Sequence, residues 1–306
     1  MRAFVLAAGL GTRLRPYSNL VPKPLFPILG KPILELILER LAQEGFHQIG
    51  INTHHLSEQI ESFLRDFRTR YPQLEIRIFH EPEILGPVGA FLGAKEFFTE
   101  DTLVVNADIL TNIPYRLLWE AHQRLQGLAT MLLTKTNSEQ DKVFIEGDEL
   151  RGFGKASGFT YLGLQVVTPA LVNLLEEGER DLIPTYQRFL NHGQKITIQV
   201  VSGFYWRDIG SPASYLAAHG DLLKGKAAIP GLEAQGPFVY PKEAPEGIIY
   251  EDWVFLPEGV ALSPGSKLRR VVAWPGAQIP PGLHQDEIFV PGLSREQQPQ
   301  ESISGS

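Results

Sequence analysis

The residues best suited to chemistry stand in the first thirty positions of this sequence. A short apolar run at residues 3–8 ends in Gly9-Leu10-Gly11-Thr12-Arg13. The glycines let backbone N–H groups wrap an anion, the threonine adds a hydroxyl donor, and the arginine fork suits phosphate oxygens. A second cation, Lys23, stands between Pro22 and Pro24, and the two prolines are expected to hold that segment extended. The pattern predicts a nucleotide phosphate site at the end of a buried strand.

Two common phosphate-binding motifs are excluded. A dinucleotide fingerprint needs a third glycine at position 14, which is Leu14, and a helix that the following prolines disfavour. A P-loop needs Gly-Lys-Ser/Thr after its first glycine, and the sequence has no such triplet. A glycine turn, an arginine and a proline-stiffened lysine remain.

Two aspartates end later segments that are predicted to be buried strands. Asp108 follows the run at residues 101–107, and the carboxyl ends of such strands are where ligands gather in open α/β sheets. A carboxylate there suits Mg²⁺, although Asp108 could instead cap the turn into a helix at 114–125. Asp208 precedes Ser211 and Pro212, which predict a helix start. A salt bridge to Arg207 is the alternative role for Asp208.

These stretches together resemble the signature of the sugar-1-phosphate nucleotidyltransferases, also called NDP-sugar pyrophosphorylases. The resemblance rests on residues 9–16 paired with Pro-Lys-Pro-Leu-Phe-Pro-Ile at 22–28, and on Trp-Arg-Asp-Ile-Gly-Ser-Pro at 206–212. It covers about residues 1–290, most closely at these motifs. It implies transfer of a nucleotidyl group from an NTP to a sugar 1-phosphate, giving NDP-sugar and pyrophosphate with Mg²⁺ as cofactor. The tail of the chain favours a mannose-1-phosphate guanylyltransferase-like enzyme over a uridylyl- or thymidylyltransferase, by family analogy alone.

The resemblance also implies residue roles. The implied catalytic residues are Arg13 and Lys23. The implied metal ligands are Asp108 and Asp208. The implied nucleotide-binding residues are Ala8, Gly9, Gly11, Thr12, Glu81 and Gly86, and the implied sugar-phosphate-binding residues are Lys155 and Gly163. Two positions depart from the family pattern: Pro87 stands in the base-recognition turn, where it removes a backbone donor, and Gly154 replaces an acidic neighbour of the phosphate-contacting lysine.

Two other functions stay open at this point. A catalytically silent homologue that senses sugar nucleotides would explain Pro87 and Gly154, whereas the retention of both cations and both aspartates favours the enzyme. A glycosyltransferase of the related GT-A fold would carry Asp-x-Asp where this chain has Asn106-Ala107-Asp108.

The elements that must position these residues predict an α/β chain. Buried strands alternate with amphipathic helices over about residues 1–225, which indicates a Rossmann-like, GT-A-like three-layer domain with a mostly parallel sheet. Residues 226–292 carry short apolar triplets with a spacing near six, typical of a degenerate hexapeptide or β-helix-like segment. We expect this segment to pack on residues 1–225 or across a homo-oligomer interface, and a cut after Gly225 to leave the phosphate site chemically complete. Residues 293–306 are polar, and we expect disorder there.

Composition limits the partners. The chain has 306 residues, 43% of them apolar, a net charge of −7 and no cysteine. An acidic chain lacks the basic field of a nucleic-acid binder, and no apolar run approaches the ~20 residues of a membrane span. The expected setting is the cytoplasm, without disulfides, and residues 3–10 are taken as a core strand rather than a signal peptide.

Overall fold

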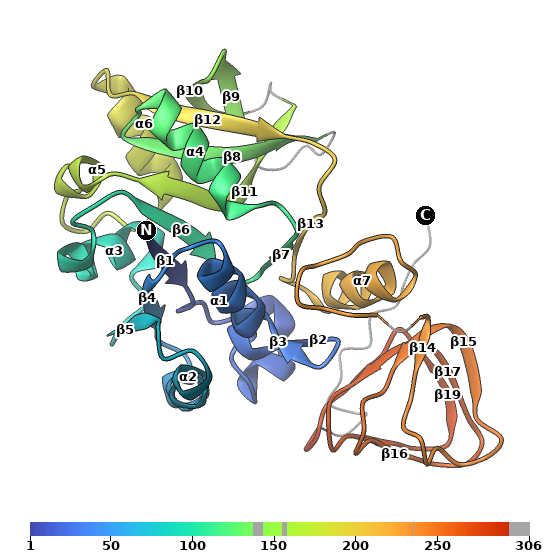
Figure 1. The fold of residues 1–306 in the computed structure, drawn as a ribbon. Coiled ribbons are helices and arrows are strands. Elements are labelled where there is room, and N and C mark those ends of the chain that lie inside the picture. Colours follow the sequence, from blue (N-terminus) through green and yellow to red (C-terminus); the bar gives the residue numbers. More distant parts are fainter. Residues whose placement is uncertain (137–142, 155–157, 235, 294–306) are drawn as a thin grey trace. The chain divides into compact units, whose positions relative to one another are not determined.

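The computed structural model describes residues 1–136, 143–154, 158–234 and 236–293 (Figure 1). The chain forms two compact units, one of Met1–Leu10 with Leu34–Trp206 and the other of Gly11–Ile33 with Arg207–Ser306. The domain boundaries proposed from the sequence, at residues 225 and 292, stay a prediction. The α-helices are α1 (Ile33–Gln43), α2 (Ser57–Arg70), α3 (Gly86–Gly93), α4 (Tyr115–Leu125), α5 (Pro169–Asn173), α6 (Leu182–Asn191) and α7 (Pro212–Leu223).

The first unit is built on a nine-stranded sheet of order β5-β4-β1-β6-β11-β8-β12-β10-β9. Its strands are β1 (Arg2–Leu6), β4 (Gln48–Thr53), β5 (Glu75–His80), β6 (Thr102–Asn106), β8 (Ala129–Lys135), β9 (Val143–Glu146), β10 (Glu149–Phe153), β11 (Phe159–Val167) and β12 (Ile196–Val201). Parallel pairs join β5, β4, β1 and β6, and also β8 and β12. Strands β11 and β10 pair antiparallel with their neighbours. The predicted α/β fold with a large, mostly parallel sheet is confirmed.

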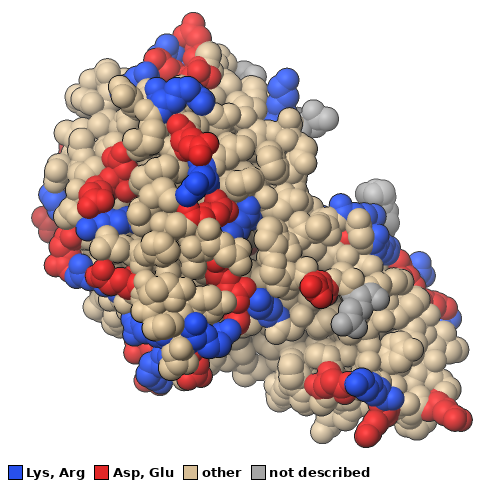
Figure 2. All heavy atoms as spheres, viewed as in Figure 1, with Lys and Arg blue, Asp and Glu red and all other residues tan. Residues whose placement is uncertain are grey.

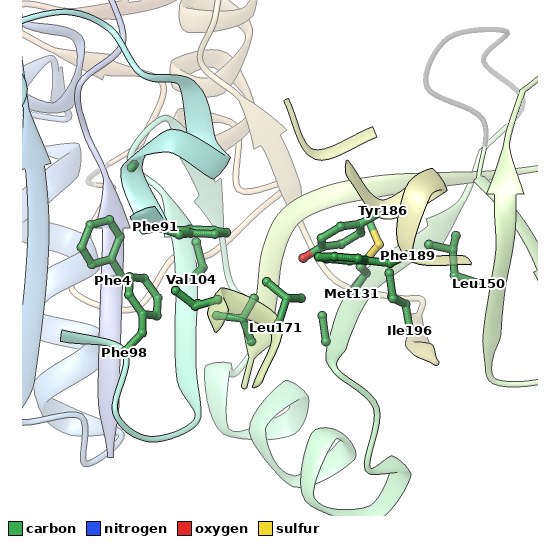
Figure 3. Close-up of a cluster of buried hydrophobic side chains, with 14 of the residues drawn as sticks. Phe4, Phe91, Phe98, Val104, Met131, Leu150, Leu171, Tyr186, Phe189 and Ile196 are labelled. Atoms are coloured by element: carbon green, nitrogen blue, oxygen red, sulfur yellow. The ribbon is translucent and has the colours of Figure 1, made fainter. Parts of the chain in front are cut away.

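Helices cover both faces of this sheet. Thr130 and Met131 are neighbours on β8, so their side chains point to opposite faces. Met131 belongs to a buried cluster fed by side chains of α3, α5 and α6, whereas the Thr130 hydroxyl lies 2.7 Å from Nδ1 of His122 on α4. The unit therefore has three layers. Figure 3 labels Phe4, Phe91, Phe98, Val104, Met131, Leu150, Leu171, Tyr186, Phe189 and Ile196 of the cluster.

The C-terminal segment of the second unit is made of short parallel strands. They are β14 (Phe238–Val239), β15 (Ile249–Phe255), β16 (Ala261–Leu262), β17 (Ser266–Ala273), β18 (Gln278–Ile279), β19 (Gly282–Gln285) and β20 (Ile288–Phe289). Ile249 pairs with Lys267 and Ser266 with Gly282, offsets of 18 and 16 residues. A buried cluster that includes Val254, Leu268 and Ile279 fills the space between the strands. Such repeated offsets are what a β-helix-like appendage would need, and that assignment stays a prediction.

The face of the molecule shown in Figure 2 carries both signs of charge. Lys and Arg side chains alternate there with Asp and Glu, and they form no continuous basic surface on that face. None of the helices in the described ranges is long and apolar enough to cross a membrane.

One buried histidine on α7 joins the helix to the loop between two short strands, β2 (Pro27–Ile28) and β3 (Lys31–Pro32). The Nδ1 atom of His219 lies 3.0 Å from the carbonyl oxygen of Tyr215, and its Nε2 accepts from the Leu29 N–H at 3.3 Å. These partners require the neutral ring, with the proton on Nδ1. Burial lowers the pKa of His219 from 6.5 to about 4, because the charged ring would lose its water.

We predict a pH-dependent loss of stability that a His219→Gln variant lacks. The pKa of His219 is lower in the folded state than in the unfolded chain, so the unfolded chain takes up the proton first. The stabilising contribution is complete above about pH 6.5 and is lost as the pH falls toward 4. It amounts to at most about 3.5 kcal/mol, since the pKa falls from 6.5 to about 4 and one pKa unit is worth about 1.4 kcal/mol. Urea unfolding at pH 7.5, 6 and 5 measures it. The exposed His47→Gln variant should keep the wild-type slope, and an equal slope in His219→Gln would contradict the assignment.

Candidate active site

Three of the predicted residues meet in the second unit. Nη2 of Arg13 lies 3.4 Å from Oδ2 of Asp208, and Nζ of Lys23 lies 3.6 Å from Oδ1 of the same carboxylate. The arginine side chain is 69% exposed and the lysine side chain 10% exposed. One carboxylate thus faces two cations, one in water and one largely withdrawn from it. The group carries a net charge of +1, which suits the binding of phosphate oxygens.

Arg13 is positioned by a tight turn. Gly11 has a φ of 62° and precedes the single 3₁₀ turn Thr12–Leu14, which buries Leu14. The carbonyl oxygen of Gly11 accepts from the Leu14 N–H at 2.8 Å and from the Ser18 hydroxyl at 2.8 Å. A Cβ atom at Gly11 would lie 3.1 Å from Cβ of Ser18 in a strained conformation. The turn therefore places Gly11, Thr12 and Arg13 together, and no long helix follows, as the sequence predicted.

Lys23 does not lie in the extended segment that the flanking prolines predicted. Residues Lys23–Leu25 form a 3₁₀ turn, because the Leu25 N–H donates to the carbonyl of Pro22 at 2.8 Å and the Phe26 N–H donates to that of Lys23 at 3.0 Å. The residues on either side of the turn, Pro22 with ψ of 141° and Phe26 with ψ of 128°, are extended. The prolines still restrict the backbone, but they prepare a turn that directs the lysine inward.

Asp208 ends strand β13 (Trp206–Asp208) and is fixed by the start of α7. The Ser214 hydroxyl donates to the Asp208 carbonyl, and the Ser211 side chain caps the helix by accepting from the Ser214 N–H at 3.2 Å. Between them, Gly210 leaves room for the ion pair, since a Cβ atom there would lie 2.4 Å from Nη2 of Arg13. Arg207 pairs instead with Asp221 at 2.6 Å, so Asp208 does not depend on its sequence neighbour for a partner.

In the first unit, a buried hydrogen-bond chain ties the end of β1 to the segment after β5. Oδ1 of Asn52 accepts from the Ala7 N–H at 2.7 Å, and Nδ2 of Asn52 donates to Oε1 of Glu81 at 2.7 Å. Oε2 of Glu81 accepts from the Leu85 N–H at 3.1 Å. Ala8 and Gly9 follow directly, and Gly86 follows Leu85. Sequence analysis missed Asn52, although a polar residue at the end of an apolar strand was a usable signal.

The turn with Gly86 is the start of a helix, not a turn before one. Helix α3 begins at Gly86, and Pro87 occupies its first turn, where a missing N–H costs little. The Val88 N–H donates to the carbonyl of Arg180 at 3.0 Å, and a Cβ atom on Gly86 would lie 2.6 Å from that same oxygen. The segment that the sequence assigned to a base-recognition turn is therefore the first turn of a helix, and the Val88 N–H of that turn finds its partner far along the chain.

The loop that provides Arg180 is itself braced. Arg188 makes two hydrogen bonds to Glu179, of 2.8 and 2.7 Å, and the same contact lowers the pKa of the Glu179 carboxyl. The Arg180 side chain also donates to the Ile84 carbonyl at 3.2 Å. The segment after β5 is thus held from two sides by backbone and side-chain contacts.

Asp108 and Gly163 both lie near the carboxyl end of β6 in the first unit, Asp108 just after that strand and Gly163 in the middle of the neighbouring β11. Asp108 is in the turn between β6 and β7 (Ile109–Thr111). Gly163 on β11 has a φ of 76°, and a Cβ atom there would lie 2.9 Å from Nδ2 of Asn106. Gly163 therefore keeps the backbone close to the end of β6. Lys155, the other predicted sugar-phosphate residue, lies outside the described residues.

The residues present fit Mg²⁺ by donor chemistry. Across the described parts of the chain, no three His, Asp or Glu side chains form a metal-binding group. Mg²⁺ does not need one, since it commonly uses one or two carboxylates beside substrate phosphates. Asp208 offers a carboxylate that is 37% exposed and held in place by backbone contacts. Asp108 lies in the first unit, and its part as the second ligand stays a prediction.

Comparison with known proteins identifies the family. Residues 2–146 match the family model described as nucleotidyl transferase. The chain is 31% identical over 273 residues to a UTP–glucose-1-phosphate uridylyltransferase of Synechocystis sp., covering 78% of this chain and 68% of that protein. It is 30% identical over 234 residues to the mannose-1-phosphate guanylyltransferase catalytic subunit beta of Danio rerio, covering 71% of this chain and 63% of that protein.

A solved structure agrees on the fold. UDP-glucose pyrophosphorylase from Acinetobacter baumanii superposes with a TM-score of 0.60 at 18% identity, covering 75% of this chain and 95% of that one. The chain therefore belongs to the nucleotidyl transferase family, and the resemblance to sugar-1-phosphate nucleotidyltransferases seen in the sequence is confirmed.

We predict that Asn52→Leu destabilises the fold. The substitution leaves the Ala7 N–H and a Glu81 oxygen without their partner in a buried place, which should lower the free energy of unfolding by about 2–4 kcal/mol. Urea unfolding measures it, with the exposed Asn173→Leu on α5 as control, expected within about 0.5 kcal/mol of wild type. Wild-type stability in Asn52→Leu would mean that the chain of bonds contributes nothing.

Proposed function

We propose that this protein transfers a nucleotidyl group from an NTP to a sugar 1-phosphate, releasing pyrophosphate. One observation carries the proposal. The cations Arg13 and Lys23 of the first motif both lie within 3.6 Å of the carboxylate of Asp208, which belongs to the second motif. The relatives named above support the same reaction class. They include both a uridylyl- and a guanylyltransferase, so they favour neither base.

The reaction needs no nucleophile from the protein. A phosphate oxygen of the sugar 1-phosphate, already anionic at pH 7, forms a bond to the α-phosphorus of the NTP. The bond from that phosphorus to the bridging oxygen of the β-phosphate breaks, and pyrophosphate leaves with the electron pair. The protein contributes alignment of the two phosphates and compensation of their charge.

The two cations suit different tasks in this step. Lys23 is held on a short turn and largely withdrawn from water, so its charge acts strongly on a nearby oxygen, and we assign it to the α-phosphate or the sugar phosphate. Arg13 is exposed and presents a planar fork, which suits the triphosphate and the departing pyrophosphate. Asp208 orients both cations until phosphate oxygens replace it as their partner.

Asp108 and Asp208 are the proposed Mg²⁺ ligands. When bound, the ion would supply positive charge to the phosphate oxygens. Arrival of the phosphates would draw Arg13 and Lys23 toward them and leave the Asp208 oxygens for the ion. The protein's own part is to present these carboxylates on backbone that is already fixed.

The remaining predicted residues divide between nucleotide and sugar. Ala8, Gly9, Gly11 and Thr12 are proposed at the NTP phosphates and ribose, Glu81 and Gly86 at the base, and Lys155 and Gly163 at the sugar phosphate. Glu81 only accepts hydrogen bonds, and each of its oxygens keeps a lone pair beyond its protein partner. Guanine offers two kinds of donor on one edge and uracil one, which is why we keep a guanylyl preference.

The direct test is pyrophosphate release across the four NTPs with glucose, mannose and galactose 1-phosphates. One pair should exceed the others by at least ~10-fold, a difference of about 1.4 kcal/mol. Binding of an NDP-sugar without turnover of any pair would indicate the silent sensor instead.

We predict that turnover requires Mg²⁺ and that both aspartates strengthen its binding. EDTA should abolish pyrophosphate release, and Asp108→Asn and Asp208→Asn should each need more Mg²⁺ for half-maximal rate, because an amide is a weaker ligand than a carboxylate. Thermal melting checks the fold. Asp148→Asn, on the exposed β9–β10 turn, is the matched control and should behave as wild type. Full turnover in EDTA would refute the metal assignment.

We predict that Arg13→Ala and Lys23→Ala each lower kcat by at least ~10²-fold, comparable to the loss of one preorganised electrostatic donor. The exposed Arg124→Ala and Lys95→Ala variants remove the same charges elsewhere and should leave kcat unchanged. A rise in KM at constant kcat would instead mean that the two residues bind substrate and transition state equally.

A further inference from the structure

Phe26 follows the Lys23 turn and is wedged between two aromatic rings of the same unit. Its ring lies 5.9 Å from Tyr215 of α7 and 5.0 Å from Trp274, both in edge-on contacts. Phe26 is buried, and its N–H donates to the carbonyl of Lys23 at 3.0 Å. Trp274 directly follows β17 of the C-terminal segment. A residue of that segment therefore packs against the turn that holds the lysine.

A hydrogen-bond relay accompanies this packing. The indole N–H of Trp274 donates to the Tyr215 hydroxyl at 3.0 Å, and that hydroxyl donates to the carbonyl of Pro27. The tyrosine hydroxyl thus accepts a hydrogen bond from Trp274 and donates one to Pro27. All three groups are buried or half-buried, where an unpaired donor or acceptor is costly.

The same helix also holds the carboxylate that Lys23 faces. The first turn of α7 binds the Asp208 backbone through Ser214, and Tyr215 is the next residue. Two neighbouring residues of one helix therefore act on the ion pair: Ser214 holds the backbone of Asp208, and Tyr215 contacts the segment that follows Lys23. Trp274, which is not part of that helix, contacts both Tyr215 and Phe26.

We propose that Trp274 is a positioning residue for Lys23 in the transferase site, so that the C-terminal segment is part of the machinery rather than a separable cap. The proposal rests on the function proposed above. Lysine has a long, flexible side chain, and its charge acts on the reaction only if its turn is fixed. A displacement of about 1 Å at a reacting group can cost ~10²-fold in rate. This proposal differs from the sequence-based expectation that the site is chemically complete without residues after Gly225, and a truncated chain would decide between them.

The test compares two buried tryptophans of the C-terminal segment. Trp274→Leu removes both the ring and the donor, and Trp274→Phe keeps a ring against Phe26 and removes the donor. Trp253 is the matched control, since it is equally buried and packs on α7 at Gly220, where a Cβ atom would lie 2.7 Å from its Nε1. We expect kcat to fall ~10²-fold in Trp274→Leu and less in Trp274→Phe, with KM within ~3-fold. Trp253→Leu should lose as much thermal stability but keep kcat within ~3-fold.

A second pair of variants tests the relay. Tyr215→Phe removes only the hydroxyl, so it should match Trp274→Phe in kcat, and the double variant should be no slower than either. Additive losses, or equal kcat losses in Trp274→Leu and Trp253→Leu, would overturn the positioning role and leave general destabilisation.

A third readout does not depend on activity. Lys23 is 10% exposed, so its acetylation by acetic anhydride, followed by mass spectrometry, should be slow in wild type and in Trp253→Leu and several-fold faster in Trp274→Leu. If wild type releases no pyrophosphate with any pair, the proposed function fails, while this labelling still reports on the turn. Unchanged labelling in Trp274→Leu, in a variant that keeps its thermal transition, contradicts the positioning role alone.

Discussion

The candidate site in the second unit depends on one ion pair, the ammonium group of Lys23 beside the carboxylate of Asp208. Lys23 is almost withdrawn from water, and a cation in that position is tolerated only with an opposite charge nearby. Asp208 provides that charge, and it shares it with the exposed Arg13. The arrangement holds two cations ready without neutralising both. An incoming phosphate can therefore exchange with the carboxylate at little cost, because each cation passes from one anionic oxygen to another.

The sequence predicted the parts of the molecule that follow from local pattern. Apolar runs predicted the parallel strands, and Ser211-Pro212 predicted the start of α7. The family resemblance carried by the two signature motifs implied roles for Arg13, Lys23 and Asp208 in one site. The three side chains do lie together, although 195 residues separate the first from the last, and their roles stay a proposal.

Contacts that depend on strand register or on distant loops could not be predicted from the sequence. Asn52 meets Glu81 only because β1, β4 and β5 pair in a particular register, in which Leu6 lies beside Asn52 and Asn52 beside Phe79. Gly86 was read as a turn residue because its helix depends on the carbonyl of Arg180. Pro22 and Pro24 indicated a stiff segment correctly, but hydrogen bonds across the prolines, which no propensity describes, decided between an extended segment and a turn.

Helix periodicity explains why α7 can serve so many partners. Ser211, Tyr215 and His219 are spaced by four residues and so lie on one stripe of the helix. Ser211 caps the helix beside Asp208. Tyr215 donates to the Pro27 carbonyl, and His219 accepts from the Leu29 N–H. A helix is rigid over three turns, so a shift at any one of these contacts must be shared by the others. The neutral ring of His219 and the hydroxyl of Tyr215 are therefore connected to the lysine turn through the helix itself, and acid titration of the histidine acts on the same element that orients the site.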